Sequence, residues 1–317
     1  MLKRFSVIAV FIIIFSMLSG CSMSIEKDDK LNIVTTIFPS GDWIREILGD
    51  EAQNINLTVL CDNGLDVHSY QPTADDIIAI STCDLFVYFG GESEEWVEDV
   101  LDGVVNEQMV VINLMQTPGI TLFAEEESNA NPHEHEGGEH PHDEHIWLSL
   151  SRAQTLCDYI AQKLGEVDTA NSDIYKENVK AYSDKLQSLD TKYRKTVEET
   201  AFNTLVFADR FPFKYLLSDY EIDYYAAFEG CSSESEASFE TIVFLSGKLK
   251  ELGLKSVITI DGSASNIASA VISSAGGNYE VLKLDSMQSV SRDDIKNGIT
   301  YISVMEENLK TIEKALN

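Results

Sequence analysis

Two groups of short apolar runs, separated by stretches with helical spacing, most constrain how this chain can fold. The first group is rich in Val, Ile and Phe and lies at residues 31–38, 55–60, 85–89 and 109–112. The second group lies at residues 204–207, 222–227, 256–260 and 279–284. Short buried runs that alternate with helical segments are typical of parallel strands joined by crossover helices. The sequence therefore predicts an α/β fold with two lobes, each built on a mainly parallel sheet.

One long helix is predicted between the two groups of strands. Residues 175–199 contain no glycine or proline, and their apolar side chains recur every three or four residues. At 1.5 Å per residue such a helix could span about 35 Å. We therefore expect an N-terminal lobe at residues 31–165, a rigid linking helix at 166–200, a C-terminal lobe at 201–317 and a cleft between the lobes. Shorter helices are predicted at residues 42–47, 73–81, 95–101, 152–164, 238–252, 266–275 and 301–316.

The first residues have the pattern of an export signal. Lys3 and Arg4 precede an apolar run at residues 5–18, and Leu18-Ser19-Gly20-Cys21 follows. The apolar run has about fourteen residues, too few for a membrane-spanning helix, which needs roughly twenty. The end of the segment resembles the lipobox of bacterial lipoproteins. That resemblance implies a signal peptide at residues 1–21, a lipid anchor on Cys21, a tether at 22–30, and a protein held at the outer face of the bacterial membrane.

The charge of the chain restricts its partners. The sequence has 53 acidic and 23 basic residues, with a net charge of −30. A surface that binds nucleic acid needs an excess of Lys and Arg, so nucleic acid is excluded as a partner. An exported body of this charge attracts cations, although the same charge also keeps a protein soluble.

Histidine is concentrated in one acidic segment, residues 124–144, and at its end. Five of the six histidines lie within residues 131–145, and the sixth is His68. Neutral imidazole nitrogens next to carboxylates favour borderline divalent ions, above all Zn²⁺. His133, His135, His140 and His142 are candidates for an accessory metal-binding loop, or for a solvated loop without a ligand. His145 differs, since it directly precedes the apolar Ile146-Trp147-Leu148.

Several further candidate ligands follow the predicted strands. His68 comes a short loop after the strand that ends at Leu60, while Asp209, Asp261 and Asp285 each follow a strand of the second group. Ligands of open α/β sheets usually bind beyond the carboxyl ends of the strands. A single aspartate at such a place is as compatible with a helix cap or a turn.

Four cysteines remain after Cys21, too few for a disulfide scaffold. They are Cys61, Cys83, Cys157 and Cys231, and none shows the C-x-x-C spacing of a metal site. Cys61 and Cys83 could form a disulfide, with buried free thiols as the alternative.

Three segments together resemble a known family. Gly64-Leu65-Asp66-Val67-His68-Ser69-Tyr70-Gln71-Pro72-Thr73, Glu144-His145-Ile146-Trp147-Leu148-Ser149 and the helix that begins at Tyr175 resemble the metal-binding solute receptors of bacterial zinc and manganese ABC importers. These are the cluster A-I, or cluster 9, solute-binding proteins. The resemblance runs from about Leu31 to the C-terminus. It implies one divalent ion in the cleft between two lobes, bound by His68 and His145 from the N-terminal lobe and by Asp285 from the C-terminal lobe.

The chain departs from this family at the position implied for the remaining ligand. Counting back from Tyr215 places Arg210 where most members have histidine or glutamate. A guanidinium cannot deprotonate and so cannot bind a cation. Asp209 is the ligand that we favour, with Arg210 paired to a nearby carboxylate, and a site with three protein ligands and water is the alternative. A carboxylate in place of histidine also admits Mn²⁺ more readily.

The resemblance implies binding and release of Zn²⁺, without catalysis, by a monomer that delivers the ion to an ABC importer permease and its ATPase. Zinc affinity should fall below about pH 6.5, where free histidine protonates. Three alternatives remain open: a manganese receptor of the same class, a surface adhesin or zinc store, and a zinc hydrolase. The hydrolase has the least support, because the sequence has no H-E-x-x-H pair.

Overall fold

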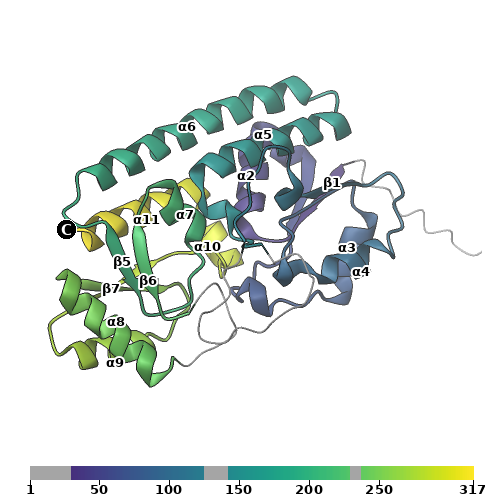
Figure 1. The fold of residues 1–317 in the computed structure, drawn as a ribbon. Coiled ribbons are helices and arrows are strands. Elements are labelled where there is room, and N and C mark those ends of the chain that lie inside the picture. The colour runs from purple at the N-terminus through teal and green to yellow at the C-terminus, as the bar shows by residue number, and fades with distance from the viewer. Residues whose placement is uncertain (1–29, 125–141, 229–236) are drawn as a thin grey trace, which may run out of the picture. The chain divides into compact units, whose positions relative to one another are not determined.

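Each half of the chain contains one four-stranded parallel sheet (Figure 1). The computed structural model describes residues 30–124, 142–228 and 237–317. The strand order is β2-β1-β3-β4 in the first sheet and β6-β5-β7-β8 in the second, and every paired strand is parallel. The strands are β1 (Leu31–Thr35), β2 (Ile55–Val59), β3 (Leu85–Tyr88), β4 (Val110–Asn113), β5 (Thr204–Phe207), β6 (Asp223–Ala226), β7 (Ser256–Ile260) and β8 (Glu280–Leu284). The predicted fold of two α/β lobes with parallel sheets is confirmed.

Helices connect and cover these strands. The predicted helices are all present, some with shifted ends, and two short helices, α7 and α10, were not predicted. The first predicted strand is shorter than expected, because Pro39 in the first turn of α2 starts a helix at Phe38. The helices are α2 (Phe38–Leu48), α3 (Ala74–Thr82), α4 (Trp96–Leu101), α5 (Leu150–Val167), α6 (Ser172–Glu198), α7 (Lys214–Asp219), α8 (Phe239–Leu252), α9 (Asn266–Ala275), α10 (Arg292–Lys296) and α11 (Tyr301–Ala315).

Helix α6 is the predicted linking helix. It has 27 residues, so it is about 40 Å long. Its buried face, which includes Tyr175, Leu186 and Tyr193, packs on α2 and α5 of the first lobe and on α11 at the end of the chain (Figure 1). Because one unbroken helix contacts both lobes, it resists a wide change in their separation.

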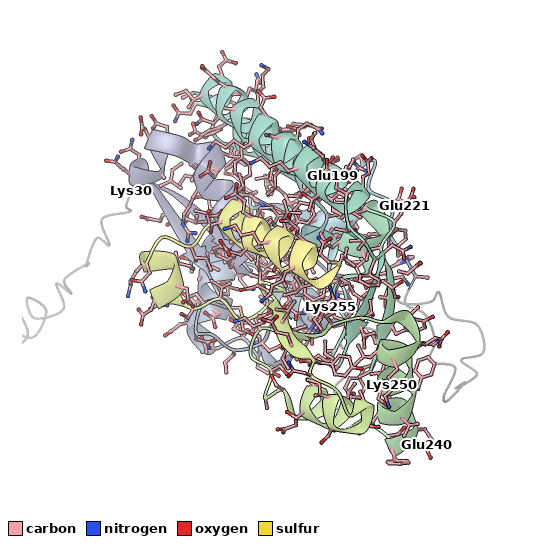
Figure 2. All side chains as sticks on the ribbon, turned by 90° about the vertical axis from the view of Figure 1, so that its left-hand side faces the viewer. Lys30, Glu199, Glu221, Glu240, Lys250 and Lys255 are labelled. Atoms are coloured by element: carbon pink, nitrogen blue, oxygen red, sulfur yellow. The ribbon has the colours of Figure 1, made fainter. Side chains whose placement is uncertain are left out.

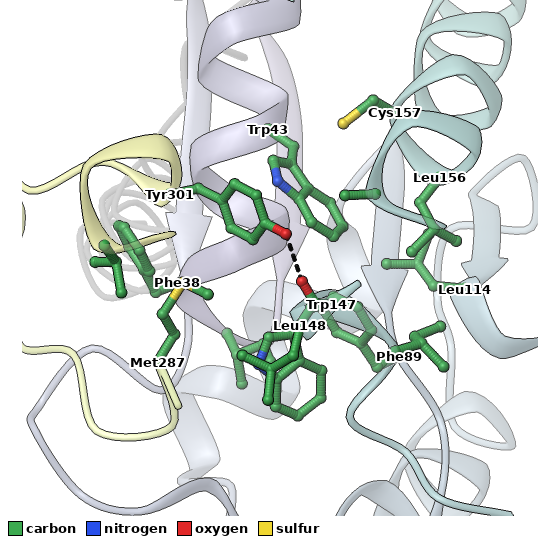
Figure 3. Packing of buried hydrophobic residues seen from close by; sticks show 14 of the residues in the cluster. Phe38, Trp43, Phe89, Leu114, Trp147, Leu148, Leu156, Cys157, Met287 and Tyr301 are labelled. Atoms are coloured by element: carbon green, nitrogen blue, oxygen red, sulfur yellow. Dashed lines mark hydrogen bonds between the residues drawn. The ribbon is translucent and has the colours of Figure 1, made fainter. Parts of the chain in front are cut away.

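Buried aromatic rings join the two lobes (Figure 3). Trp43 of α2 packs edge-on against Phe89 and against Tyr301 of α11, with ring centroids 5.9 and 5.2 Å apart. Phe89 in turn packs edge-on against Trp147 at 5.0 Å. The Tyr301 hydroxyl donates a hydrogen bond of 2.6 Å to the carbonyl oxygen of Trp147. These contacts fix the segment around Trp147 against both the first and the last helices of the described fold.

A buried carboxylate also lies where α2 meets α11. Asp42 is 5% exposed and accepts a hydrogen bond of 2.8 Å from the backbone amide of Tyr301. Burial raises the pKa of Asp42 to about 6, although the amide hydrogen bond lowers it in part. Because the folded-state pKa lies above the ordinary value of 3.8, the stability associated with protonated Asp42 is complete below about pH 3.8 and is lost as the pH rises through 6.

We therefore expect Asp42→Asn to stabilise the protein at pH 7 and to have little effect at pH 4. A shift of about two pKa units corresponds to roughly 3 kcal/mol at pH 7. The asparagine oxygen can still accept from Tyr301. Urea unfolding of the wild type and the variant at both pH values measures the difference. A stability difference that is the same at pH 4 and pH 7 would show that Asp42 is not the titrating group.

Of the two alternatives for Cys61 and Cys83, a disulfide or buried free thiols, the structure shows free thiols. Both thiols are buried and free, as is that of Cys157. Cys61 lies just beyond the carboxyl end of β2, whereas Cys83 lies just before the amino end of β3. In a parallel sheet these ends are at opposite edges, so the two sulfurs cannot meet. Burial raises the pKa of both thiols to about 12. Cys231 lies outside the described residues.

Charged side chains cover the outer surface (Figure 2). Glu199, Glu221 and Glu240 are exposed, as are Lys250 and Lys255. The excess of acid is thus spread over solvent-facing helices and turns. Within the described ranges, no helix has both the length and the apolar character needed to cross a membrane. The expected signal peptide, the tether and the lipidation site Cys21 lie outside those ranges.

Candidate metal site

The loop after β2 carries His68. Asp66 caps the single helical turn Val67–Ser69, and its Oδ1 accepts a hydrogen bond of 3.0 Å from the backbone amide of His68. The other carboxylate oxygen of Asp66 is paired with Arg210 of the second lobe at 2.5 Å. The His68 side chain is 20% exposed, so it is the more accessible of the two histidines at this site.

His145 is fixed by the residues on either side of it. Asp143 Oδ1 lies 2.9 Å from both the backbone nitrogen and the ring Nδ1 of His145. After His145, the indole N–H of Trp147 donates a hydrogen bond of 2.9 Å to the carbonyl oxygen of Ser286 in the second lobe. His145 is 1% exposed. The ring is therefore held in one orientation by a local carboxylate and by an anchor to the opposite lobe.

The two imidazoles face each other through their Nε2 atoms, which are 3.3 Å apart. Gln288, from the segment after β8, places its side-chain nitrogen 2.7 Å from His68 Nε2 and 2.8 Å from His145 Nε2. The structure thus brings together the two predicted N-terminal ligands, which lie 77 residues apart in the sequence. Gln288 adds a contact from the second lobe that the sequence did not identify.

The hydrogen-bond partners of the two rings favour the tautomer with the proton on Nδ1 in each. His145 Nδ1 is next to the Asp143 carboxylate, which can only accept. His68 Nδ1 lies 2.5 Å from Ser93 Oγ and 3.2 Å from Glu144 Oε1. Ser93 donates its hydroxyl to Glu144 Oε1 and its amide to Glu144 Oε2, so its oxygen is left to accept from His68. The Nε2 lone pairs of both rings consequently point at each other and at Gln288.

Burial controls the charge of this site. Burial, together with the neighbouring His145, lowers the pKa of His68 to about 4. Burial also raises the pKa of Glu144. His68 is therefore neutral near pH 7, the form that binds metals. Proton competition at His68 is expected at a lower pH than the 6.5 anticipated from free histidine.

His68, Glu144 and His145 form the one group of three or more His, Cys, Asp or Glu among the described residues whose ligand atoms lie within 4.8 Å of one another. Glu144 lies on the Nδ1 side of His68, away from the facing Nε2 atoms. It therefore orients His68 as Asp143 orients His145, in the carboxylate–histidine arrangement that is common around bound zinc. The adjacent Asp143-Glu144-His145 was the available sequence signal for this role.

The two carboxylates expected as ligands from the second lobe, Asp209 and Asp285, accept hydrogen bonds from backbone amides. Asp209 accepts hydrogen bonds from the backbone amides of Arg210 and Ile260, at 3.0 and 3.3 Å. Asp285 accepts one of 2.8 Å from the amide of Met287. Neither belongs to the cluster around the histidines among the described residues. Each carboxylate accepts hydrogen bonds from backbone amides of its own lobe, and its role as a metal ligand stays a prediction.

Of the remaining histidines, only His142 lies within the described residues. His142 is exposed, and its backbone forms an isolated antiparallel bridge with Ala124. His133, His135 and His140 lie outside the described residues. Arg210, at the position expected for a ligand, forms the ion pair with Asp66 and so supports the turn that carries His68.

The family model described as "ZnuA: Zinc-uptake complex component A periplasmic" matches residues 33–315. The chain belongs to this ZnuA family. The match covers both lobes and the linking helix, so it confirms the resemblance that the sequence motifs indicated.

Several proteins are similar to this ZnuA-family chain. Zinc-binding lipoprotein AdcA of Streptococcus pneumoniae is 31% identical over 297 residues, which are 94% of this chain and 58% of AdcA. High-affinity zinc uptake system protein ZnuA of Bacillus subtilis is 28% identical over 322 residues, covering 100% of this chain and 99% of that protein. The crystal structure of the Zn(II)-bound ZnuA-like domain of S. pneumoniae AdcA superposes with a TM-score of 0.72 at 29% identity, covering 90% of this chain and 99% of that domain. This chain therefore spans only about 58% of the length of AdcA.

Proposed function

We propose that this ZnuA-family protein is an extracytoplasmic receptor that binds Zn²⁺ between its lobes and delivers it to an ABC importer. His68 and His145 bind the ion through Nε2 in this proposal, while Ser93, Asp143 and Glu144 hold the rings. The relatives named as zinc-binding and zinc-uptake proteins support this choice of ion. No step of the proposed function is catalytic.

The spacing of the two Nε2 atoms is the observation that carries the proposal. Zinc binds histidine nitrogen at about 2.0 to 2.1 Å and prefers tetrahedral geometry. An ion at this distance from two nitrogens 3.3 Å apart would have an N–Zn–N angle of about 107°. That angle is close to the tetrahedral value, and both lone pairs already point inward. Little rearrangement of the first lobe is needed to accept the ion.

The proposed partners follow from the function. A lipid anchor on Cys21 would hold the receptor at the outer face of the membrane, next to an ABC permease and its ATPase. The buried aromatic contacts and the unbroken helix α6 support small adjustments between the lobes. The permease would then distinguish the loaded receptor by its cleft surface, which changes when the ion binds.

A competition titration tests the proposed function. The purified, metal-stripped protein is titrated with Zn²⁺ or Mn²⁺ against a chelator of known affinity. We expect one tight zinc equivalent, weaker binding of manganese, and any further zinc bound more weakly by the His-rich segment. Comparable or preferred manganese would reassign the receptor to that ion. Weak binding of several ions, with no single tight equivalent, would contradict a receptor and favour an adhesin or a zinc store.

A further inference from the structure

Gln288, in the second lobe, contacts both facing Nε2 atoms through its side-chain nitrogen. Gln288 is buried, with an exposed fraction of 3%. The backbone carbonyl of Gln288 also accepts a hydrogen bond of 3.2 Å from the amide of Val67, next to His68. Gln288 is thus held next to the imidazoles by its backbone as well as by its side chain. A buried residue in this position affects any ion that enters.

The amide nitrogen of Gln288 is placed to donate to both imidazoles. Because the Nδ1 protons are engaged by Ser93 and by Asp143, the Nε2 atoms of His68 and His145 carry lone pairs. Two lone pairs 3.3 Å apart repel each other unless a positively polarised group lies against both. The NH₂ group of glutamine has two N–H bonds and can donate one to each ring.

The opposite end of the amide is less well matched. Gln288 Oε1 lies 3.0 Å from the Ser286 hydroxyl, which is also 2.6 Å from Asp261 Oδ1. A hydroxyl has one proton, and the charged carboxylate is the closer and stronger acceptor. When Ser286 donates to Asp261, its oxygen has lone pairs toward Gln288. These lone pairs suit an N–H group of the amide better than they suit Oε1.

We propose that the Gln288 amide is a reversible stand-in for the metal, and that it turns over on metal binding so that Oε1 becomes the third protein ligand. This inference rests on the proposed function. An NH₂ group cannot bind a cation, whereas the amide oxygen can. After the amide has rotated, its NH₂ group donates to the Ser286 hydroxyl. Ser286 therefore contacts the amide both before and after zinc binds. The two ends of the amide exchange roles while the side chain remains buried.

The ligand from the second lobe is then neutral. Asp209 and Asp285 are engaged by backbone amides, and Arg210 is paired with Asp66. Two neutral imidazoles and an amide oxygen do not compensate the charge of the bound ion. The nearest carboxylates, Asp143 and Glu144, contact the imidazole rings and not the ion. The site should therefore bind zinc less tightly, and release it more readily, than a site closed by a carboxylate.

Three substitutions at Gln288 test the inference by zinc competition titration. Gln288→Ala and Gln288→Met remove the amide, and Met keeps nearly the same volume in case the alanine variant is unstable. We expect each to bind zinc at least about 10-fold more weakly than the wild type, because a ligand is lost. Gln288→Glu should bind at least about 10-fold more tightly, because a carboxylate replaces a neutral oxygen. Gln108→Ala, at an exposed glutamine, is the matched control.

The direction of the effect decides between ligand and competitor. If Gln288→Met binds zinc as tightly as or more tightly than the wild type, the amide only obstructs the ion and the inference is overturned. Failure of the proposed function looks different, since the wild type would then lack a tight zinc equivalent. The side-chain ¹⁵N–¹H₂ signals of Gln288 give a second readout: they should shift on adding one equivalent of Zn²⁺, and unchanged signals would also overturn the turn-over.

Discussion

Replacing His145 by alanine should reduce zinc affinity by at least about 100-fold. The substitution removes one of the two inward-facing Nε2 lone pairs, and it leaves Asp143 without the ring that it orients. Loss of an orienting partner alone typically reduces metal affinity 10- to 100-fold, so loss of a ligand should exceed that range. The measurement is the same chelator competition as for the wild type, with circular dichroism to confirm that the variant is folded.

Two further variants make this result specific. His68→Ala removes the second ring, which is more exposed and therefore less important for packing, and should show a comparable loss. His142→Ala removes an exposed histidine three residues from His145 and should leave the tight zinc equivalent unchanged. Unchanged affinity in both His68→Ala and His145→Ala would place the zinc outside this pair and sink the proposed site.

Replacing Trp147 by alanine should lower the free energy of unfolding by about 3 to 5 kcal/mol. The indole is 1% exposed and packs edge-on against Phe89, and its N–H donates to Ser286 of the second lobe. The substitution leaves a cavity where the two lobes meet and removes that hydrogen bond. Urea unfolding measures the loss, and zinc titration of the folded variant should also show weaker binding, since Trp147 packs 5.1 Å from the His145 ring.

The control for this variant is another tryptophan. Trp96 is half-buried in the first lobe and packs against Tyr70 at 5.9 Å. Trp96→Ala should cost less stability than Trp147→Ala and should leave zinc affinity nearly unchanged. Equal losses of stability in the two variants would show that the aromatic contacts between the lobes contribute no more than an ordinary buried surface.

The candidate site was predicted unevenly. His68 and His145 were identified because the motifs around them are specific and because histidine is rare elsewhere in the chain. Asp209 and Asp285 were expected as ligands from the family resemblance and because both follow strands at one edge of a parallel sheet, which is also where backbone amides require caps. In the structure, both carboxylates accept hydrogen bonds from such amides. Position along a strand cannot distinguish the two roles, because both require the same residue type.

Gln288 was missed for a different reason. Glutamine is common on surfaces, and nothing in its local sequence marks it as buried between two rings. Its role depends on contact between the segment after β8 and the loop after β2. Gln288 and His68 are 220 residues apart in the sequence, so they meet only in the folded state. Glu144 and Ser93 likewise meet at His68 from separate segments.

The sequence by itself determined the elements of this protein: eight strands in two groups, the long helix between them, and the two histidines. These features depend on local periodicity and on specific motifs, which a linear pattern carries. Only the tertiary structure decided which side chains meet in the cleft, which nitrogen of each ring faces inward, and that Cys61 and Cys83 remain apart. Those outcomes depend on the relative placement of distant strand ends to within an ångström, and the local sequence contains no measure of that distance.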